Sequence, residues 1–255
     1  MILTVDVGNS NIVLAAVEGD EILFEARLLT DAARTADQYR ADAQAVLEAH
    51  GVDPRKLEGS VIASVVPAVQ EALFHALHRL TGQEPLTVVP GLKTGLTVLT
   101  DDPNEIGADL VVGSVAALRM YQPPVIMVDM GTATTVMALN RDGAFVGGCI
   151  APGVRISMDA LTGRTALLPD LELEMPEKAI GSNTVDCMRS GVLMGAACML
   201  DGMVERMEAE LGCKTTVIAT GGIARFVIPM CKTPMIYDQD LLVKGLAILY
   251  RENRG

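Results

Sequence analysis

The stretch TVDVGNSNIVLAAVEGDEILF, residues 4–24, decides the fold, because its pattern returns in MVDMGTATTVMALNRDGAFVG, residues 127–147. In each copy an apolar run ends in an Asp-x-Gly loop, a second apolar run follows, and a polar turn leads to a third run. Short apolar runs separated by Gly and Asp turn residues are typical of consecutive β-strands. The two loop aspartates, Asp6 and Asp129, are 129 − 6 = 123 residues apart. The chain therefore contains an internal duplication.

Strands and helices alternate around the two copies. The pattern predicts buried strands at 61–66, 86–89 and 215–219, and helices at 36–50, 67–80, 106–121 and 241–251. Residues 184–210 are predicted to form either one long helix or two. This alternation is typical of α/β proteins. We expect an α/β fold of two duplicated lobes, residues 1–120 and 121–255, which face each other around a nucleotide cleft.

The composition is that of a globular protein with a sizeable core, since 50% of the 255 residues are hydrophobic and 20% are charged. The formal net charge is 20 − 32 = −12, which argues against nucleic-acid binding because phosphate contact depends on clustered Lys and Arg. The five cysteines form no CxxC pair. The N-terminal segment is unlike a signal peptide, and no apolar run reaches about 18 residues. We expect a cytoplasmic protein with reduced thiols and no membrane contact.

The duplicated loops have the chemistry of a phosphate site. Glycine permits a tight turn, the exposed N–H groups and hydroxyls can hold phosphate oxygens, and the Asp can hold a metal ion. A single loop of this kind is also common in ordinary hairpins. Two copies favour a pair of loops that clamp a polyphosphate, with Asp6 and Asp129 sharing the cation.

A third glycine loop, Ala219-Thr220-Gly221-Gly222, follows a predicted strand. It is either a strand-to-helix turn or a wall for a nucleotide base or ribose, because paired glycines permit close approach. The sequence contains no GxxxxGK[ST] and no GxGxxG motif, so neither a P-loop nor a Rossmann site is indicated.

Asp109 lies in the first turn of the helix predicted from residue 106. A carboxylate there can complement the helix dipole. It can also accept the proton of a hydroxyl that attacks a phosphate, as a positioned Asp does in phosphoryl transfer.

Several motifs resemble, in order and spacing, those of type III pantothenate kinases. They are DVGNSN at 6–11, TADQY at 35–39, SVVP at 64–67, GAD at 107–109, DMGTATT at 129–135, GGCIAPG at 147–153, LP at 168–169, GSNT at 181–184 and TGG at 220–222. The resemblance runs from about residue 2 to residue 250. The Asp-x-Gly loops alone would indicate only the superfamily of acetate kinase, sugar kinases, actin and heat-shock chaperones.

The resemblance implies two ribonuclease-H-like (actin-like) lobes and a homodimer that phosphorylates the terminal hydroxyl of pantothenate, the first step of coenzyme A synthesis. It also implies Mg²⁺ with ATP, and a monovalent cation, K⁺ or NH₄⁺. On the matching positions, Asp109 is the catalytic proton acceptor, and Asp6 and Asp129 are metal ligands. The ATP site comprises Asp6, Val7, Gly8, Asn9, Ser10, Asn11, Ile12, Val13, Thr132, Gly221 and Gly222. The pantothenate site comprises Thr100, Gly107, Ala108, Asp109, Leu110 and Thr184.

Three positions depart from the family pattern, and all three lie on the acceptor side. Similar sequences usually carry Arg at Leu110, Tyr at Thr100 and Asn at Gly113. The phosphate loops are intact. Two alternatives to a pantothenate kinase therefore stay open: a divergent paralogue that phosphorylates another small alcohol, and a nucleotide-binding regulator without kinase activity.

Overall fold

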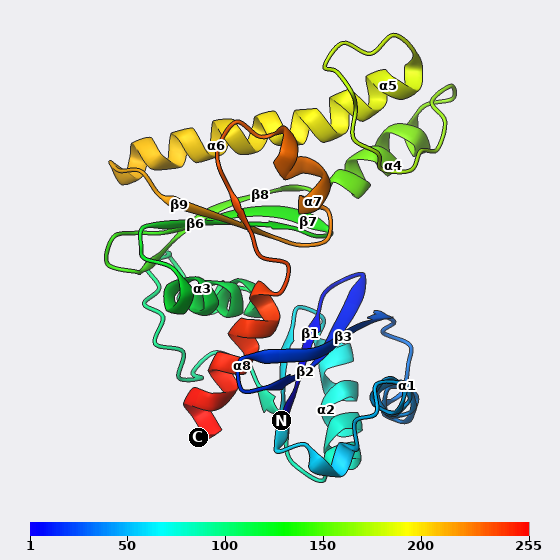
Figure 1. Cartoon of the computed structure of the whole chain (residues 1–255), viewed down its shortest axis with the longest axis vertical. Helices are drawn as coiled ribbons and strands as arrows, with labels where there is room; N and C mark the ends of the chain where they lie inside the picture. Colours follow the sequence, from blue (N-terminus) through cyan, green and yellow to red (C-terminus); the bar gives the residue numbers. More distant parts are fainter. Residues whose placement is uncertain (255) are drawn as a thin grey trace. The chain divides into compact units, whose positions relative to one another are not determined.

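The computed structural model describes residues 1–254, which form two compact units (Figure 1). The first unit comprises Met1–Leu96, Asp102–Ala116 and the C-terminal stretch from Asp240. The second comprises Thr97–Asp101 and Ala117–Gln239. The predicted lobes, 1–120 and 121–255, stay a proposal; the units differ from them chiefly because the C-terminal helix groups with the first half of the chain.

The first unit is built on a five-stranded sheet of order β3-β2-β1-β4-β5. Its strands are β1 (Ile2–Val7), β2 (Asn11–Glu18), β3 (Glu21–Leu29), β4 (Gly59–Ser64) and β5 (Leu86–Thr87). The predicted meander is confirmed: β1 pairs antiparallel with β2, and β2 pairs antiparallel with β3. On the other side of β1, β4 pairs parallel with β1, and β5 pairs parallel with β4.

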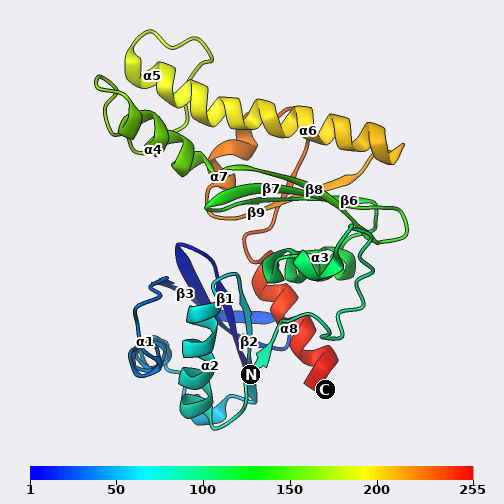
Figure 2. The same ribbon diagram turned by 180° about the vertical axis from the view of Figure 1, so that it is seen from behind.

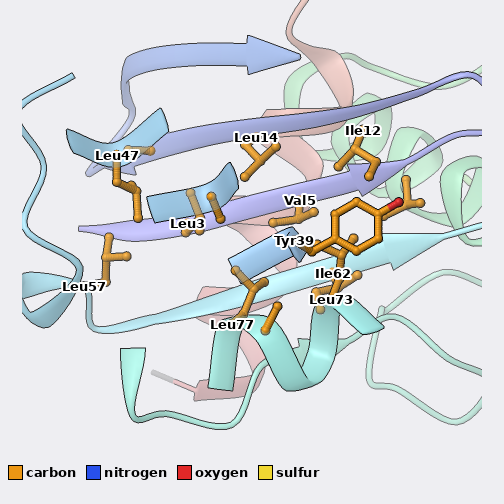
Figure 3. Close-up of a cluster of buried hydrophobic side chains, with 14 of the residues drawn as sticks. Leu3, Val5, Ile12, Leu14, Tyr39, Leu47, Leu57, Ile62, Leu73 and Leu77 are labelled. Atoms are coloured by element: carbon orange, nitrogen blue, oxygen red, sulfur yellow. The ribbon is translucent and has the colours of Figure 1, made fainter. Parts of the chain in front are cut away.

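Helices cover both faces of this sheet. They are α1 (Ala36–Ala49), α2 (Pro67–Thr81), α3 (Ala108–Met120, of which residues to Ala116 belong to this unit) and α8 (Leu241–Arg254), with short 3₁₀ turns at Pro54–Lys56 and Pro103–Glu105. Side chains alternate along a strand, so neighbouring residues of β4 face opposite ways. Ile62 packs into the core with α1 and α2 (Figure 3), whereas Val61 and Ala63 pack with α3 and α8.

The second unit repeats the topology, with a sheet of order β10-β9-β6-β7-β8. Its strands are β6 (Val125–Met130), β7 (Ala133–Leu139), β8 (Phe145–Pro152), β9 (Thr216–Thr220) and β10 (Ile236–Tyr237). β6 lies between an antiparallel and a parallel neighbour, as β1 does, and the two strands have the same succession of four buried residues, a partly buried Asp and a buried last residue. The duplication inferred from the sequence is therefore a duplication of structure.

A long helical segment lies along one face of the second sheet, and the reverse view shows it from behind (Figure 2). It consists of α5 (Thr184–Arg189), a π-helical turn (Ser190–Met194) and α6 (Gly195–Leu211). The same face carries α4 (Val154–Arg164) and α7 (Ala224–Val227), the latter followed by a 3₁₀ turn at Ile228–Met230. Of the two alternatives for residues 184–210, one long helix or two, the structure shows one continuous helical segment. α4 was not predicted, because its apolar residues do not form one buried helix face: only Val154 and Met158 are buried, whereas Ile156 and Leu161 are exposed.

The duplicated hairpins differ by one residue. Val7 pairs with Ile12 across residues 8–11, whereas Met130 pairs with Thr134 across residues 131–133. Matching the two copies without a gap puts Thr135 in the place of Ile12, which is one residue out of register. Since facing alternates along a strand, only the pairing of the strands reveals which side chains lie beside Asp129.

One helical segment, Thr184–Leu211, has the length and composition of a membrane span. A single such helix is weak support for a span, because core helices of soluble proteins meet the same criteria. Here Leu193, Ala197 and Leu200 are fully buried against the second sheet and its covering helices.

Candidate functional site

The first Asp-x-Gly loop projects from the end of β1. Asp6 is partly buried, and Asn9, Ser10 and Asn11 are exposed. The loop is closed by a hydrogen bond of 3.0 Å from the Gly8 N–H to the carbonyl oxygen of Asn11. The loop therefore presents polar side chains and backbone to solvent, as a phosphate site requires.

The hydrophobic residues predicted for the ATP site do not lie on the exposed surface of this loop. Val7 and Ile12 are buried in the core between the sheet and its helices, and Val13 is partly buried on the opposite side. These side chains fix the register of the hairpin. Contact between Val7 or Ile12 and a nucleotide would have to be through the backbone.

A support for this loop was missed in the sequence. The Thr30 hydroxyl donates to the carbonyl oxygen of Gly8 at 2.7 Å, and its N–H donates to the Ser10 carbonyl at 3.1 Å. The adjacent Asp31 is held by Tyr39, which is fully buried and donates its hydroxyl to the Asp31 carbonyl at 2.8 Å. Thr35 caps α1 through a capping box with Gln38. The TADQY motif thus anchors the segment that holds the phosphate loop.

The second Asp-x-Gly loop lies beside the third glycine loop. β6 and β9 are parallel neighbours with Asp129 opposite Thr220, so both loops leave the same edge of the sheet. Gly221 has φ +89°, and a Cβ there would lie 2.7 Å from Asp129 Oδ1 and 2.6 Å from the Met130 carbonyl oxygen. Glycine is therefore required at 221 both by its backbone angle and by this close approach. Thr132 is exposed on the same edge.

The glycines of GGCIAPG serve close packing within the chain itself. A Cβ at Gly148 would overlap the backbone of β7, and one at Gly153 would overlap the carbonyl oxygen of Thr132. Gly153 precedes α4, so this helix begins directly against the second Asp-x-Gly loop. The bare backbone at these two positions fixes the course of that loop.

Asp109 lies in the first turn of α3 and is partly buried. Burial raises the pKa of its carboxyl above the ordinary 3.8, although backbone N–H groups, including that of Leu110 at 2.8 Å from Oδ1, act in the opposite direction. Gly107 leaves room for this carboxylate, because a Cβ there would lie 2.5 Å from Oδ1. The group is thus held at a helix N-terminus, as the dipole argument predicts, and its raised pKa suits a proton acceptor.

The other residues predicted for the acceptor site fall in both units. Gly107, Ala108 and Leu110 accompany Asp109 in the first unit. Thr100 belongs to the second unit, where it follows Leu99, whose N–H donates to the Phe145 carbonyl at 2.8 Å. Thr184, also in the second unit, is exposed at the start of α5, and its neighbour Asn183 caps that helix.

The carboxylates of the two Asp-x-Gly loops suit a metal ion that takes most of its ligands from a nucleotide and water. Among residues 1–254 there is no group of three or more His, Cys, Asp or Glu side chains that could hold a metal. Mg²⁺ in phosphoryl-transfer sites commonly has one or two protein carboxylates, with phosphate and water supplying the other ligands. A single Asp in each loop fits that arrangement.

An unpaired hydroxyl lies next to Asp129. Thr135 is directly opposite Asp129 in the β6–β7 pair, so the two side chains share one face of the sheet. Thr135 Oγ1 is buried and has no hydrogen-bond partner within the described part of the chain. The pair Asp129 and Thr135 therefore offers oxygen donors for a monovalent cation.

The structure contains no disulfide among the described cysteines. All five are free. Burial, with the nearby Asp201 and Cys198, raises the pKa of Cys231 to about 12, and burial raises the pKa of Cys149 as well. Both thiols therefore stay protonated at neutral pH.

The architecture and its loops define a class. Two sheets of the same topology, each with an Asp-x-Gly loop after the strand between its antiparallel and parallel neighbours, characterise the actin-like fold. The chain aligns over 98% of its length with a solved polyphosphate/ATP-glucomannokinase from Arthrobacter, at 14% identity and TM-score 0.51, covering 98% of that protein. It also aligns with a Campylobacter jejuni protein described as a Baf family transcriptional activator, at 19% identity and TM-score 0.64, with 98% of each chain covered. At these identities the likeness shows the fold alone.

Sequence comparison gives the family. The family model for type III pantothenate kinase matches residues 2–206. A type III pantothenate kinase of Moorella thermoacetica is 41% identical over 253 residues, which is 99% of this chain and 100% of that protein. The chain belongs to the type III pantothenate kinase family and is a phosphotransferase.

Proposed function

We propose that this chain transfers the γ-phosphoryl group of ATP to the terminal hydroxyl of pantothenate, giving 4′-phosphopantothenate in the first step of coenzyme A biosynthesis. The observation that carries this function is family membership over the full length, joined to two intact phosphate loops on duplicated sheets. Asp109, with its raised pKa at the start of α3, supplies the acid–base group that the reaction needs.

The reaction divides among three parts of the chain. The loop Asp6–Asn11 and the loop at Thr132 hold phosphate oxygens through backbone N–H groups and hydroxyls. Asp109 accepts the proton of the pantothenate hydroxyl as its oxygen bonds to the γ-phosphorus. The bond from that phosphorus to the β,γ-bridging oxygen breaks, and ADP leaves. Asp6 would hold Mg²⁺ together with ATP, and the ion would supply positive charge that offsets the charge on the phosphates.

The test is purified protein with γ-labelled ATP and a panel of alcohols that includes pantothenate and a pantothenate amide. Label transferred to pantothenate supports the proposal. Transfer only to the amide or to another alcohol would show a divergent paralogue, and nucleotide binding without transfer to any acceptor would show a regulator. The matched blank is the same reaction without acceptor, which measures ATP hydrolysis.

A monovalent cation at Asp129 should make activity depend on K⁺. We expect the rate at fixed Mg²⁺ to be higher in K⁺ than in Na⁺, because the larger ion suits loosely arranged oxygen donors. Thr135→Val, which removes the buried hydroxyl but keeps the shape, should raise the K⁺ concentration for half-maximal rate. Ser60→Ala removes another buried hydroxyl that has no partner among residues 1–254, in β4, and should leave the K⁺ response unchanged. Equal rates in Na⁺ and K⁺ would contradict the cation site.

Leu110 should weaken the binding of pantothenate. An Arg can hold a carboxylate through two parallel hydrogen bonds, and Leu can donate none. We expect Leu110→Arg, alone or with Thr100→Tyr, to lower the KM for pantothenate by about tenfold, or roughly 1.4 kcal/mol. The KM for ATP serves as the internal control. A wild type with a low KM that the Arg variant does not improve would show that other donors bind the carboxylate.

The protein is proposed to be a cytoplasmic homodimer that binds small molecules and neither nucleic acid nor membrane. Six of the thirteen exposed large hydrophobic side chains in the described residues lie between residues 150 and 180, on and after β8 and α4. They are Ile150, Ile156, Leu161, Leu167, Met175 and Ile180. A contiguous exposed apolar patch marks protein–protein contact, and we propose that these side chains form such a patch at the dimer interface. Sedimentation equilibrium should give twice the 27.0 kDa chain mass, and Leu167→Asp with Ile180→Asp should shift it to the monomer.

A further inference from the structure

Thr30 places both of its polar donors on the first Asp-x-Gly loop. It follows β3 directly, at the point where the ladder between β2 and β3 reaches the loop. Its hydroxyl donates to the Gly8 carbonyl oxygen at 2.7 Å, and its N–H donates to the Ser10 carbonyl oxygen at 3.1 Å. One residue thus fixes the direction of two carbonyl groups, those of the peptide bonds that lead into Asn9 and Asn11.

The direction of these carbonyl groups decides where two N–H groups point. A peptide bond is planar and trans, so its C=O and its N–H point in opposite directions. Because both carbonyls point to Thr30, the N–H groups of Asn9 and Asn11 point to the side of the loop away from it. Both asparagines are exposed. Backbone N–H groups on one side of a turn can form an anion-binding concavity.

Thr30 is itself held from the core of the first unit. Tyr39 is fully buried among the core side chains (Figure 3). Its hydroxyl accepts from the Asp31 N–H at 3.1 Å and donates to the Asp31 carbonyl oxygen at 2.8 Å. The Asp31 carboxylate accepts from the Ala33 N–H at 2.9 Å, which closes the turn after Thr30. The two donors of Thr30 are therefore anchored to the core and not to the exposed loop that they hold.

We propose that Thr30 is a positioning residue for ATP, which turns the Asn9 and Asn11 N–H groups toward the phosphate chain. The proposal rests on the proposed function and adds to it the residue that sets the direction of the loop's donors. Without the Thr30 hydroxyl the Gly8 carbonyl loses this partner, and the peptide bond between Gly8 and Asn9 is free to turn. The Asn9 N–H then no longer points to a phosphate oxygen. Losing one hydrogen bond to a charged group lowers affinity by about tenfold to 100-fold.

Equilibrium dialysis with labelled ATP and no acceptor tests this role directly. Thr30→Val keeps the branched shape and the backbone N–H, removes only the hydroxyl, and should weaken ATP binding by about tenfold or more. Thr30→Ser keeps the hydroxyl and should bind ATP within about twofold of the wild type. Thr81→Val is the matched control. The Thr81 hydroxyl also donates to a backbone carbonyl in the first unit, that of Leu77 at 2.9 Å, but it lies at the end of α2 and takes no part in the loop. This control should bind ATP as the wild type does.

Kinetics and urea unfolding separate positioning from a general loss of structure. Thr30→Val should raise the KM for ATP and leave the KM for pantothenate nearly unchanged. Its urea midpoint should be close to that of Thr81→Val, because each variant loses a hydroxyl that donates to a backbone carbonyl.

Three results overturn the proposal: wild-type ATP binding by Thr30→Val, ATP binding by Thr30→Ser as weak as that by Thr30→Val, or an equal loss of ATP binding in Thr81→Val. A Thr30→Val variant that loses ATP binding and also unfolds at much lower urea than Thr81→Val overturns it too, since the hydroxyl would then hold the fold in general. A wild type that binds ATP but phosphorylates no pantothenate would instead sink the proposed function alone.

Discussion

Asp109→Asn is expected to lower kcat by about 100-fold to 10,000-fold, the range typical of the loss of a general base. The amide is nearly isosteric with the carboxylate and can still accept from the Leu110 N–H, so α3 should begin as before. It cannot take the proton of the attacking hydroxyl. The KM for ATP should change little. The assay is steady-state phosphorylation of pantothenate with each substrate varied in turn.

Because the pKa of Asp109 is raised, the variant that loses activity should gain stability. Burial favours the protonated carboxyl in the folded chain, so this group's contribution to stability is fully present below its unfolded pKa and is lost as pH rises through its folded pKa. At neutral pH the ionised group is therefore unfavourable, and Asp109→Asn should unfold at a higher denaturant concentration than the wild type. Activity of the wild type should fall as the pH is lowered through the raised pKa.

Glu105→Gln is the matched control, because Glu105 is an exposed carboxylate in the turn just before α3. It should keep both kcat and stability. An Asp109→Asn variant with near-normal turnover would remove the residue from the catalytic role. A variant that is both inactive and less stable than the wild type would show that the carboxylate is needed to form the helix start instead.

The fold could be predicted from the sequence because its decisive signals are local and repeated. Asp6 and Asp129 each end an apolar run at a glycine turn, and the repetition of that pattern gave the duplicated meander. The start of α1 could also be predicted from neighbouring residues, since Thr35 and Gln38 form a capping box within four residues. Such features depend on neighbours in the chain, which the sequence displays directly.

The supporting residues of the candidate site could not be predicted because their partners are distant in the chain. Thr30 bonds to Gly8, and Tyr237 to Gly221, only because strand pairing brings them together. Nothing in the residues around Thr30 or Tyr237 distinguishes them from other surface positions. The requirement for glycine at 153 could not be predicted for the same reason. A Cβ there would meet backbone oxygens of Gly131 and Thr132, which lie about twenty residues away in another loop.

Gly153→Ala is expected to damage both the stability of the second unit and its use of ATP. The new Cβ would overlap the Thr132 carbonyl oxygen and lie 2.8 Å from that of Gly131. Both obstacles are backbone atoms, which cannot rotate aside as a flexible side chain can, so the cost should be near the upper end of overpacking, about 3 kcal/mol. The phosphate loop must shift to make room, and misplacement by about 1 Å can lower kcat/KM for ATP by roughly 100-fold.

The same helix supplies the control. Gly163 is exposed in the last turn of α4, and a Cβ there would meet nothing within 4 Å. Gly163→Ala should therefore raise the free energy of unfolding by roughly 0.5 to 1 kcal/mol, because alanine loses less backbone entropy in a helix. Each variant adds one methyl group, at the N-cap or in the last turn of α4. In urea unfolding, Gly153→Ala should lower the free energy of unfolding and Gly163→Ala should raise it. In steady-state kinetics, only Gly153→Ala should change the kinetic constants for ATP. If Gly153→Ala is as stable and as active as the wild type, the loop at Thr132 is not fixed by this contact, and the second phosphate site must be built from other residues.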